Sequence, residues 1–352
     1  MQFDVMASSL PLADMQTLAK KIEDSGLDGI WLTEGGRTAY LSCAAAALAT
    51  QRVTLGTAIA LAFPRSPMIT AQVAWELAEA CKGRFVLGIG TQIKPHIERR
   101  FSMPYDPPGP RLREYVLALK AIFEAFQTRS PMKFEGKYYN HEMWGTTWNP
   151  GSIEHPDVPV YVSAVRPWMC KMAGEVSDGL HFHPFHSPAY IREQMLPHIQ
   201  AGADKAGRDL SEVMFVIPVM ICVGDTEEEV AKTREHARTM IAFYGTTRAY
   251  ASVFEQHGYD DLCSQLHRKQ KEGDYAAQIA LVTDEVLDHY VVTAEWNNLA
   301  EKLLERYRGI APSMRIMTYT AMSQMNSNPE VLERWGAVAQ DMHRKDMPSL
   351  EA

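Results

Sequence analysis

Residues 53–101 read VTLGTAIALAFPRSPMITAQVAWELAEACKGRFVLGIGTQIKPHIERRF. Short apolar runs at 53–55 and 85–89 each give way to small residues, and between them residues 67–81 place apolar side chains at helical spacing. This pattern predicts two parallel strands joined by a helix. Small residues after both strands would let a flat ligand approach the backbone at their carboxyl ends, which is where α/β enzymes build their sites.

The same alternation of strand and helix continues along the chain. Further strands are expected at residues 3–7, 29–33, 160–163, 179–182, 214–223 and 314–318, with helices between them. Eight alternating strand–helix units favour a (β/α)8 TIM barrel, an α/β fold, over a doubly wound sheet. We expect one barrel domain over residues 1–352, with insertions after strands four and seven at approximately 128–159 and 245–293.

The bulk composition excludes several classes of protein. The net charge is −8 and no run of Lys or Arg occurs, so no nucleic-acid partner is expected. The longest apolar run, residues 41–49, is far shorter than the roughly 20 residues that span a bilayer, and no secretion signal opens the chain. Neither a membrane partner nor export is therefore expected. The five cysteines are odd in number, widely spaced and never arranged as CxxC, which indicates reduced packing residues in a cytoplasmic protein.

A loop after the fifth expected strand is a candidate anion site. Residues 163–166, SAVR, lie between that strand and a helix that Pro167 is suited to begin. Their free N–H groups would face the positive end of that helix, where a phosphate fits. The alternative is an ordinary connecting loop with a serine cap.

The segment HFHPFH at 181–186 contains three histidines. His181 and His183 are two apart on an expected strand and therefore face the same way. Such a pair can bind zinc in barrel hydrolases, but those enzymes carry it on the first strand with further His and Asp ligands on later strands, and no such set is evident here. The alternatives are that His183 lines a site, or that the pair is structural.

Polar residues after the second and fourth expected strands are further candidates. Glu34 and Arg37 could act as a general base and an anion clamp, or form a solvent-exposed salt bridge. After the fourth strand, residues 91–96 read TQIKPH, and a helix beginning there would place Gln92 and His96 near the rim of a pocket. The alternative is a polar loop with one surface histidine.

Several longer motifs resemble the luciferase-like monooxygenase superfamily, and in particular its branch of coenzyme F420-dependent oxidoreductases. They are LGTAIALAFPRSP (55–67), GRFVLGIGTQIKPHIERRFSMP (83–104), VPVYVSAVRP (158–167), GEVSDGLHFHPFH (174–186), IAFYGTTRAY (241–250) and DEVLD (284–288). The resemblance covers roughly residues 1–320. It implies a (β/α)8 barrel of the bacterial-luciferase-like type that binds a flavin or a deazaflavin.

The resemblance also implies roles for particular positions. In these enzymes a bulge after the third strand, often containing a non-proline cis peptide, backs the tricyclic ring, and Ala58 and Ile59 occupy that place. Gln92 and His96 match positions that bond the polar edge of the ring, and Thr91 beside them is expected at the mouth of the pocket.

Two further parts of the site follow from the same resemblance. The backbone of Ser163, Ala164 and Val165 matches the cradle for the cofactor phosphate. The side chain of His183, at the end of the sixth strand, would point toward the floor of the pocket.

One departure from the family pattern affects the catalytic residues. Related sequences usually carry a His-Asp pair soon after the Glu of the second strand, whereas this chain reads EGGRTAY at 34–40. Arg37 could replace the missing histidine as an anion binder or electrophile, but it stays charged and cannot shuttle a proton. The catalytic candidates are therefore Glu34, Arg37 and His183.

These observations favour an oxidoreductase that passes a hydride between coenzyme F420 and a small organic substrate. Lys94, Arg99 and Arg100 are candidates to meet the anionic glutamate tail of F420. One alternative is an FMN-dependent luciferase-like monooxygenase. Others are a metal-dependent hydrolase that uses the histidine pair and a barrel that binds flavin without catalysis; a metal is not part of the favoured interpretation.

The substrate and the oligomeric state are less constrained. An apolar or aromatic small molecule is suggested by aromatic residues near the expected site, namely Tyr138, Tyr139, Trp144, Trp148, Phe182 and Phe185. A homodimer is expected because relatives are often dimers.

Overall fold

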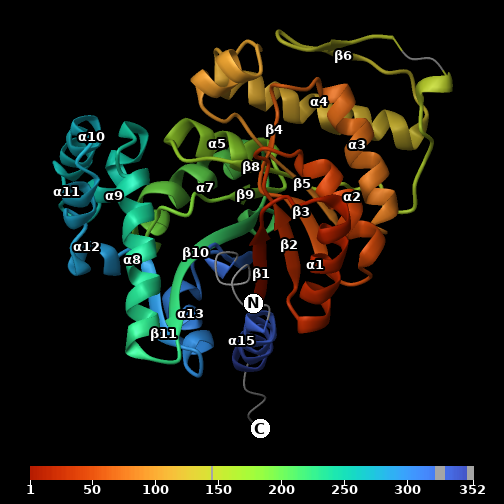
Figure 1. The fold of residues 1–352 in the computed structure, drawn as a ribbon. Helices are drawn as coiled ribbons and strands as arrows, with labels where there is room; N and C mark the ends of the chain where they lie inside the picture. Colours follow the sequence, from red (N-terminus) through yellow and green to blue (C-terminus); the bar gives the residue numbers. More distant parts are fainter. Residues whose placement is uncertain (144–145, 322–329, 347–352) are drawn as a thin grey trace.

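The computed structural model describes residues 1–143, 146–321 and 330–346. Within these ranges, eight parallel strand positions close into a barrel at the centre of the molecule (Figure 1). In order around the barrel they are β1 (Gln2–Ala7), β2 (Gly29–Leu32), β3 (Thr54–Thr57) continued by β4 (Ala60–Leu61), β5 (Phe85–Gly90), β8 (Val160–Ser163), β9 (Gly179–His181), β10 (Met214–Gly224) and β12 (Met314–Thr318). Pairing of β1 with β12 closes the ring. The (β/α)8 barrel predicted from the sequence is confirmed.

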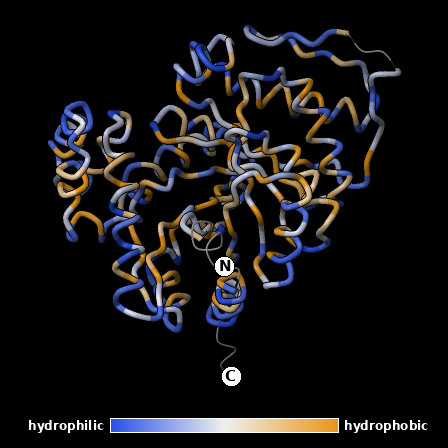
Figure 2. Tube along the Cα trace, viewed as in Figure 1, coloured by the Kyte–Doolittle hydropathy of each residue, from blue (hydrophilic) through white to orange (hydrophobic). Residues whose placement is uncertain are grey.

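Helices form the outer layer and follow the strands as the periodicity predicted. They are α1 (Leu12–Ser25), α2 (Ala39–Ala49), α3 (Pro67–Ala80), α4 (Pro108–Thr128), α5 (Pro167–Val176), α6 (Pro188–Tyr190), α7 (Leu196–Lys205), α8 (Glu227–Tyr244), α13 (Leu299–Tyr307) and α15 (Val331–Asp346). Figure 2 shows apolar residues along the central strands and hydrophilic residues in the outer turns. The sequence also predicts a closing helix over residues 328–344; the structure describes it as α15, and residues 328 and 329 lie outside the described ranges.

The third strand position of the barrel is broken by a bulge. Before the bulge β3 pairs with β5 in one register, and after it β4 pairs with β5 in a register shifted by one residue. The peptide bond between Ala58 and Ile59 in the bulge is cis. The cis peptide expected here from the family resemblance is confirmed, and the strand position extends past the predicted end at residue 55.

The amino-terminal end of the barrel interior is filled by a buried ion pair and aromatic rings. Arg315 donates to Asp4 through Nε at 2.6 Å and through Nη2 at 2.7 Å. The indole N–H of Trp31 donates to the same carboxylate at 2.8 Å, and its ring stacks on Tyr161. Because this end is filled, the space for a ligand lies at the carboxyl ends of the strands.

The first insertion lies between α4 and β8 and projects from the upper edge of the molecule in Figure 1. It carries a two-stranded hairpin of β6 (Phe134–Glu135) and β7 (Asn140–His141). Glu114 of α4 accepts hydrogen bonds from the backbone N–H groups of residues 137–139, which fixes the turn of this hairpin on the barrel.

The second insertion is mostly helical, as predicted, but it ends in a strand that the sequence did not reveal. Its elements are α9 (Ala251–Glu255), α10 (Leu262–Glu272), α11 (Tyr275–Ala280), α12 (Asp284–Asp288) and β11 (Val291–Glu295). β11 pairs in parallel with the last residues of β10, outside the barrel. Hydrophobic periodicity cannot show this pairing, because it depends on how far β10 continues beyond the barrel.

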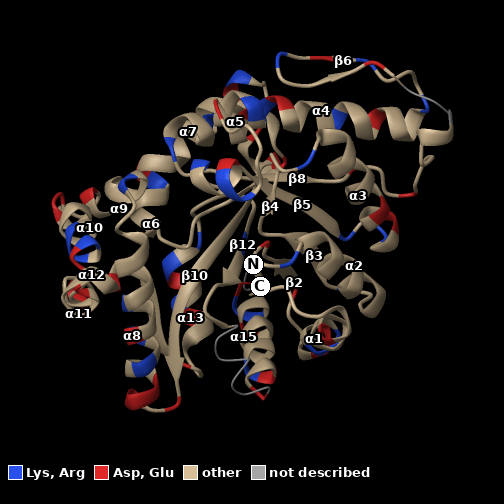
Figure 3. Cartoon of the chain, turned by 45° about the horizontal axis from the view of Figure 1, so that its top comes forward, with Lys and Arg blue, Asp and Glu red and all other residues tan. Residues whose placement is uncertain are grey.

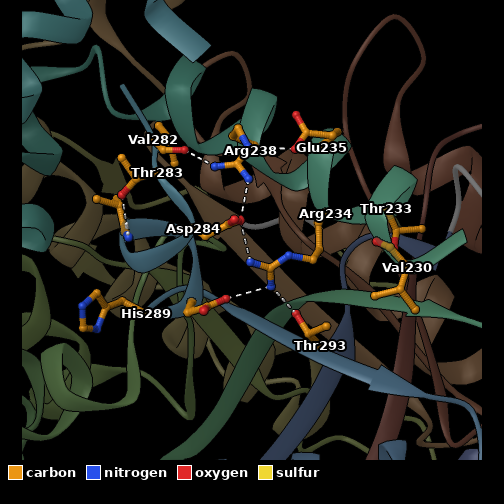
Figure 4. Close-up of polar contacts among 12 residues, drawn as sticks. Val230, Thr233, Arg234, Glu235, Arg238, Val282, Thr283, Asp284, His289 and Thr293 are labelled. Carbon is orange, nitrogen blue, oxygen red and sulfur yellow. Dashed lines mark hydrogen bonds and ion pairs between the residues drawn. The ribbon is translucent and has the colours of Figure 1, made fainter. Parts of the chain in front are cut away.

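Two arginines of α8 hold the end of the second insertion in place (Figure 4). Arg234 donates to Asp284 at 2.9 Å and to Asp288 at 2.7 Å. It also donates to Thr293 of β11 at 2.7 Å. Arg238 donates to the Asp284 carboxylate at 2.7 Å. Both aspartates are exposed, so these ion pairs are screened by solvent, and their main effect is to position α12 and β11 against α8.

The distribution of charge on the surface and the burial of the cysteines agree with what the composition predicted. Figure 3 shows Lys and Arg interspersed with Asp and Glu on outer helices such as α8. The five cysteines are free and buried, as expected for reduced packing residues. In the described part of the chain, no helix is long and apolar enough to cross a bilayer.

Candidate active site

A cavity of about 740 Å³ opens at the carboxyl ends of the barrel strands. Its volume lies in the usual range for ligand pockets. Strand ends and the loops that follow them supply its lining, which includes Glu34, Ala58, Ile59, Thr91, Gln92, Ser163, Ala164, Val165 and His183. The structure therefore brings together most of the predicted site residues, at the predicted end of the barrel.

Two predicted residues lie outside the lining of this cavity. Arg37 is exposed on the loop after β2, and His96 is exposed at the start of a wide helical turn, His96–Arg100. Gln92 lines the cavity and has a positive φ of 56°, which turns the chain at the rim so that His96 faces solvent. The geometry therefore gives no support to Arg37 as a substitute for the missing family histidine or to His96 at the edge of a ring.

Glu34 lines the cavity but is held in an ion pair. Arg65 donates to its carboxylate at 2.5 and 3.1 Å, and the backbone N–H of Leu61 donates at 2.8 Å. The Glu34 side chain is only 5% exposed. Burial acts to lower the pKa of Arg65, but the hydrogen bond and charge of Glu34 outweigh it and raise that pKa. Glu34 therefore connects β2 to the segment after the bulge, and protein donors occupy both of its carboxylate oxygens.

Gly90 allows the bulge to approach the anion loop. A Cβ at this position would lie 2.1 Å from Ile59 Cδ1 and 2.4 Å from Ser163 Oγ. Both distances are far inside van der Waals contact. A side chain at position 90 would therefore require the Ile59 and Ser163 side chains to shift, and the glycine serves close packing of the two segments that line the cavity.

The loop between β8 and α5 has the features of an anion site. Within the described residues, the backbone N–H groups of Ala164, Val165 and Arg166 donate to no protein acceptor. They precede the amino-terminal end of α5, which begins at Pro167. Free N–H groups next to a positive helix end suit a phosphate, as predicted for this loop.

A second cavity of about 340 Å³ adjoins the first beyond this loop. The two linings share Val165, Arg166 and Ala249, and the second includes Arg248 and Glu255 as well. Neither guanidinium group forms a hydrogen bond or an ion pair with any residue in the described ranges. Two guanidinium groups against one carboxylate leave the second cavity with an excess of positive charge.

The two predicted histidines occupy different depths. His181, the last residue of β9, is 3% exposed, packs its ring on the edge of Trp31, and has no hydrogen-bond partner for either ring nitrogen. His183 follows the strand and accepts the backbone N–H of Phe185 at Nδ1, at 3.1 Å. Burial lowers the pKa of each to about 3. Both rings are therefore neutral at pH 7, and in His183 the proton resides on Nε2.

The histidines do not form part of a larger ligand set. Across residues 1–143, 146–321 and 330–346, no three His, Cys, Asp or Glu side chains are grouped so as to hold a metal ion.

Two tyrosines to which the sequence assigned no role line one wall of the cavity, and a third contacts them. Tyr250 and Tyr319 line it, and the Tyr244 hydroxyl is hydrogen-bonded to that of Tyr319. The His183 ring stacks on Tyr250 at 4.4 Å between centroids and meets Tyr244 edge-on at 4.8 Å. Tyr319 directly follows β12, so the rule that site residues follow barrel strands could have found it.

The aromatic residues expected near a substrate are only partly at the cavity. Phe182 lines it, whereas Tyr138, Tyr139, Trp148 and Phe185 do not. Trp144 lies outside the described residues.

Residues 2–313 match the family model described as luciferase-like monooxygenase. The chain belongs to this family. Members of the luciferase-like family are F420- or FMN-dependent oxidoreductases and monooxygenases, so the protein is an enzyme of this kind rather than a hydrolase.

Relatives by sequence include both uncharacterized and named proteins. An uncharacterized protein of Mycobacterium tuberculosis is 41% identical over 299 residues, covering 85% of this chain and 88% of the relative. A 5,10-methylenetetrahydromethanopterin reductase of Archaeoglobus fulgidus is 27% identical and covers 83% of this chain and 85% of that protein.

Solved structures of an F420-dependent enzyme and of an FMN-bound enzyme share the fold. The coenzyme F420-dependent tetrahydromethanopterin reductase of Methanopyrus kandleri matches with a TM-score of 0.77 at 21% identity, over 98% of this chain and 99% of that chain. The oxygenating constituent of 3,6-diketocamphane monooxygenase of Pseudomonas putida, in complex with FMN, matches with a TM-score of 0.62 at 17% identity, over 97% and 98%. Identities this low establish the fold and leave the choice of cofactor open.

Proposed function

We propose that this luciferase-like enzyme transfers a hydride between coenzyme F420 and a small organic substrate. The observation that carries the choice of F420 over FMN is the second cavity, which continues from the anion loop. It is lined by two arginines whose guanidinium groups have no hydrogen-bond or ion-pair partner in the described ranges. FMN ends at its phosphate, whereas F420 continues beyond its phosphate into a chain of glutamate carboxylates. A positively charged extension suits the longer anion.

The residues of the main cavity fit a tricyclic ring with a phosphate at one end. Ala58 and Ile59 would cover one face of the ring, Thr91 and Gln92 would lie at its rim, and the backbone of residues 163–165 would receive the phosphate. When bound, the deazaflavin supplies a carbon that accepts or donates a hydride but does not activate oxygen as flavin does. The protein positions the reactants and excludes water on the covered face.

The wall formed by the tyrosines and His183 is assigned to the substrate. Its aromatic rings, together with Phe182 and Met317 of the lining, suit an apolar or aromatic small molecule. The Nε2–H of His183 is available as a neutral hydrogen-bond donor, so His183 remains a catalytic candidate. Arg37 does not line the cavity and is not proposed to act there.

Titration with F420 and with FMN tests the cofactor choice. Each is added to purified protein at low and at moderate ionic strength, and cofactor fluorescence reports binding. F420 should bind more tightly, and added salt should weaken its binding more, because exposed charges are screened over about 8–10 Å at physiological ionic strength. Tight binding of FMN without detectable binding of F420 would establish the monooxygenase alternative instead.

Two further expectations remain predictions. The homodimer would be tested by sedimentation of the purified protein over a range of concentrations. The cytoplasmic location rests on the five reduced, buried cysteines and would be tested by fractionation of the source cells.

A further inference from the structure

A hydrogen-bonded pair of tyrosine hydroxyls lies at the substrate wall. The Tyr319 side chain lines the cavity immediately after β12, and its hydroxyl contacts that of Tyr244, the last residue of α8. Tyr244 is half-buried and is not among the residues that line the cavity. A lining hydroxyl and a non-lining hydroxyl are therefore joined by one hydrogen bond at this wall.

Other groups at this wall are poorly placed to exchange a proton. Both carboxylate oxygens of Glu34 accept hydrogen bonds from Arg65. His183 is neutral and can donate a hydrogen bond from Nε2, but its Nδ1 accepts the N–H of Phe185, so no hydroxyl neighbour returns a proton to it. The Tyr250 hydroxyl makes no hydrogen bond to any residue in the described ranges, so a proton that it lost would not be replaced from a neighbour.

We propose that Tyr319 exchanges the proton that accompanies hydride transfer, and that Tyr244 positions Tyr319 and returns its proton. This inference rests on the proposed function and adds the chemical class of the substrate. The proposal commits to a carbonyl substrate, whose oxygen gains a proton when its carbon gains a hydride.

The step balances as follows for reduction of the carbonyl. The carbonyl carbon receives a hydride from the reduced deazaflavin, and the carbonyl oxygen takes the proton of Tyr319. The Tyr319 oxygen takes the proton of Tyr244 as its own O–H bond breaks, and water reprotonates Tyr244. The second proton of the reduced cofactor is released to solvent, so the net products are the alcohol and the oxidised cofactor.

The surroundings of the pair favour transfer in one concerted movement. Burial raises the pKa of Tyr319, as do the charge and hydrogen bond of Tyr244, and burial also raises the pKa of Tyr244. Both hydroxyls are therefore protonated near neutral pH and ready to donate. A free phenolate is disfavoured at this wall, which is why the second hydroxyl must supply its proton as the first is lost.

The first test needs no substrate or cofactor. Protein labelled at tyrosine Cζ is studied by NMR as wild type and as the Tyr244→Phe, Tyr319→Phe and Tyr275→Phe variants. Replacing either partner of the pair should shift the Cζ signal of the other, whereas Tyr275→Phe, an exposed change on α11, should shift neither. Unshifted signals in both pair variants would overturn the proposal, because the hydroxyls would not be joined in solution.

The second test uses the enzyme with reduced F420 and three carbonyl probes, namely acetone, cyclohexanone and benzaldehyde. Tyr319→Phe should lower kcat about 10²–10⁴-fold, the usual contribution of a positioned proton donor, and should leave the affinity for F420 unchanged. Tyr244→Phe should cause a smaller loss and reduce the solvent isotope effect on kcat. Tyr275→Phe should match the wild type.

Three outcomes of the second test would overturn the proposal while F420 still binds. They are retention of kcat in Tyr319→Phe, a loss confined to Tyr250→Phe, and no turnover of any probe by the wild type. Failure of F420 to bind would instead contradict the proposed function, and the NMR test would still report on the pair.

Discussion

Glu34 and Arg65 meet through both carboxylate oxygens directly beside the bulge. Arg65 Nη2 lies 2.5 Å from Glu34 Oε1, and Nη1 lies 3.1 Å from Oε2. Glu34 also accepts the backbone N–H of Leu61, the residue in which β4 ends. One carboxylate thus connects the end of β2, the bulged strand and the loop before α3, and its chief effect is on the shape of the cavity.

Removal of this carboxylate should destabilise the protein and weaken cofactor binding together. Glu34→Ala leaves the Arg65 guanidinium without its partner and the Leu61 N–H unsatisfied. The free energy of unfolding should fall by about 3 kcal/mol, the lower end for a broken buried pair because Arg65 is 21% exposed. Urea unfolding and cofactor titration measure the two effects.

Lys20→Ala provides the matched control, because it removes an exposed ion pair with Asp24 on α1 and should change neither quantity. A Glu34→Ala variant of normal stability with no activity would restore Glu34 as a catalytic base.

Gly90→Ala should have a strong effect on the same region. The added methyl group would overlap Ile59 Cδ1 and Ser163 Oγ, so both side chains, which line the cavity, would have to shift. We expect a loss of stability of about 1–3 kcal/mol from overpacking, and weaker cofactor binding than the stability change alone explains. Thermal unfolding and fluorescence titration are the measurements. Gly35→Ala is the control, since a Cβ there has no neighbour within 4 Å. If Gly35→Ala and Gly90→Ala had equal effects on stability and binding, the close packing at Gly90 would be contradicted.

The barrel and the anion loop were predictable because each depends on local sequence. Alternation of apolar strands and amphipathic helices gave eight units, and the SAVRP segment at 163–167 combines small residues with a proline suited to a helix start. The family resemblance located the bulge at Ala58 and Ile59, which local patterns could not have done.

The parts that the sequence missed depend on long-range contacts. Glu34 is 31 residues from Arg65, and nothing in the sequence shows which cation a carboxylate meets. Arg166 and Arg248 come from different elements, and that they line one cavity depends on how the second insertion packs beside the loop before α5. The exposure of His96 depends on the backbone turn at Gln92.

Stability should fall as the pH is lowered from 7 to about 5. Burial lowers the pKa of His181 to about 3 and that of His186 to about 4, whereas an unfolded histidine titrates near 6.5. The unfolded state therefore binds more protons below about pH 6.5, and the stability present above that pH is lost progressively as the pH falls toward the folded pKa values. At pH 5 the loss should be roughly 2 kcal/mol for each histidine. Urea unfolding at both pH values measures it.

His181→Met should reduce this pH dependence. Because neither ring nitrogen of His181 has a partner, the apolar replacement loses no hydrogen bond. His236→Gln, an exposed change on α8, should leave the pH dependence as in the wild type. An unchanged pH dependence in His181→Met would show that this ring titrates normally in the folded protein.

The tail of F420 should depend on Arg166 and Arg248 more than on the basic residues near the rim. Lys94 is already paired with Asp106 and Glu98, and Arg100 donates to the carbonyl of Gly35 at 3.0 Å. Arg166→Gln and Arg248→Gln should each weaken F420 binding about two- to fivefold at low salt, as expected for exposed ion pairs, and the effect should shrink as salt is added.

Two comparisons make this prediction specific. FMN lacks the tail, so Arg248→Gln should leave its affinity unchanged. Arg99→Gln removes an exposed arginine that lines neither cavity, so it should leave F420 affinity unchanged as well. If Arg99→Gln lost more F420 affinity than Arg166→Gln and Arg248→Gln, the tail would be assigned to the rim cluster of Lys94, Arg99 and Arg100. The second cavity would then no longer be a reason to favour F420 over FMN.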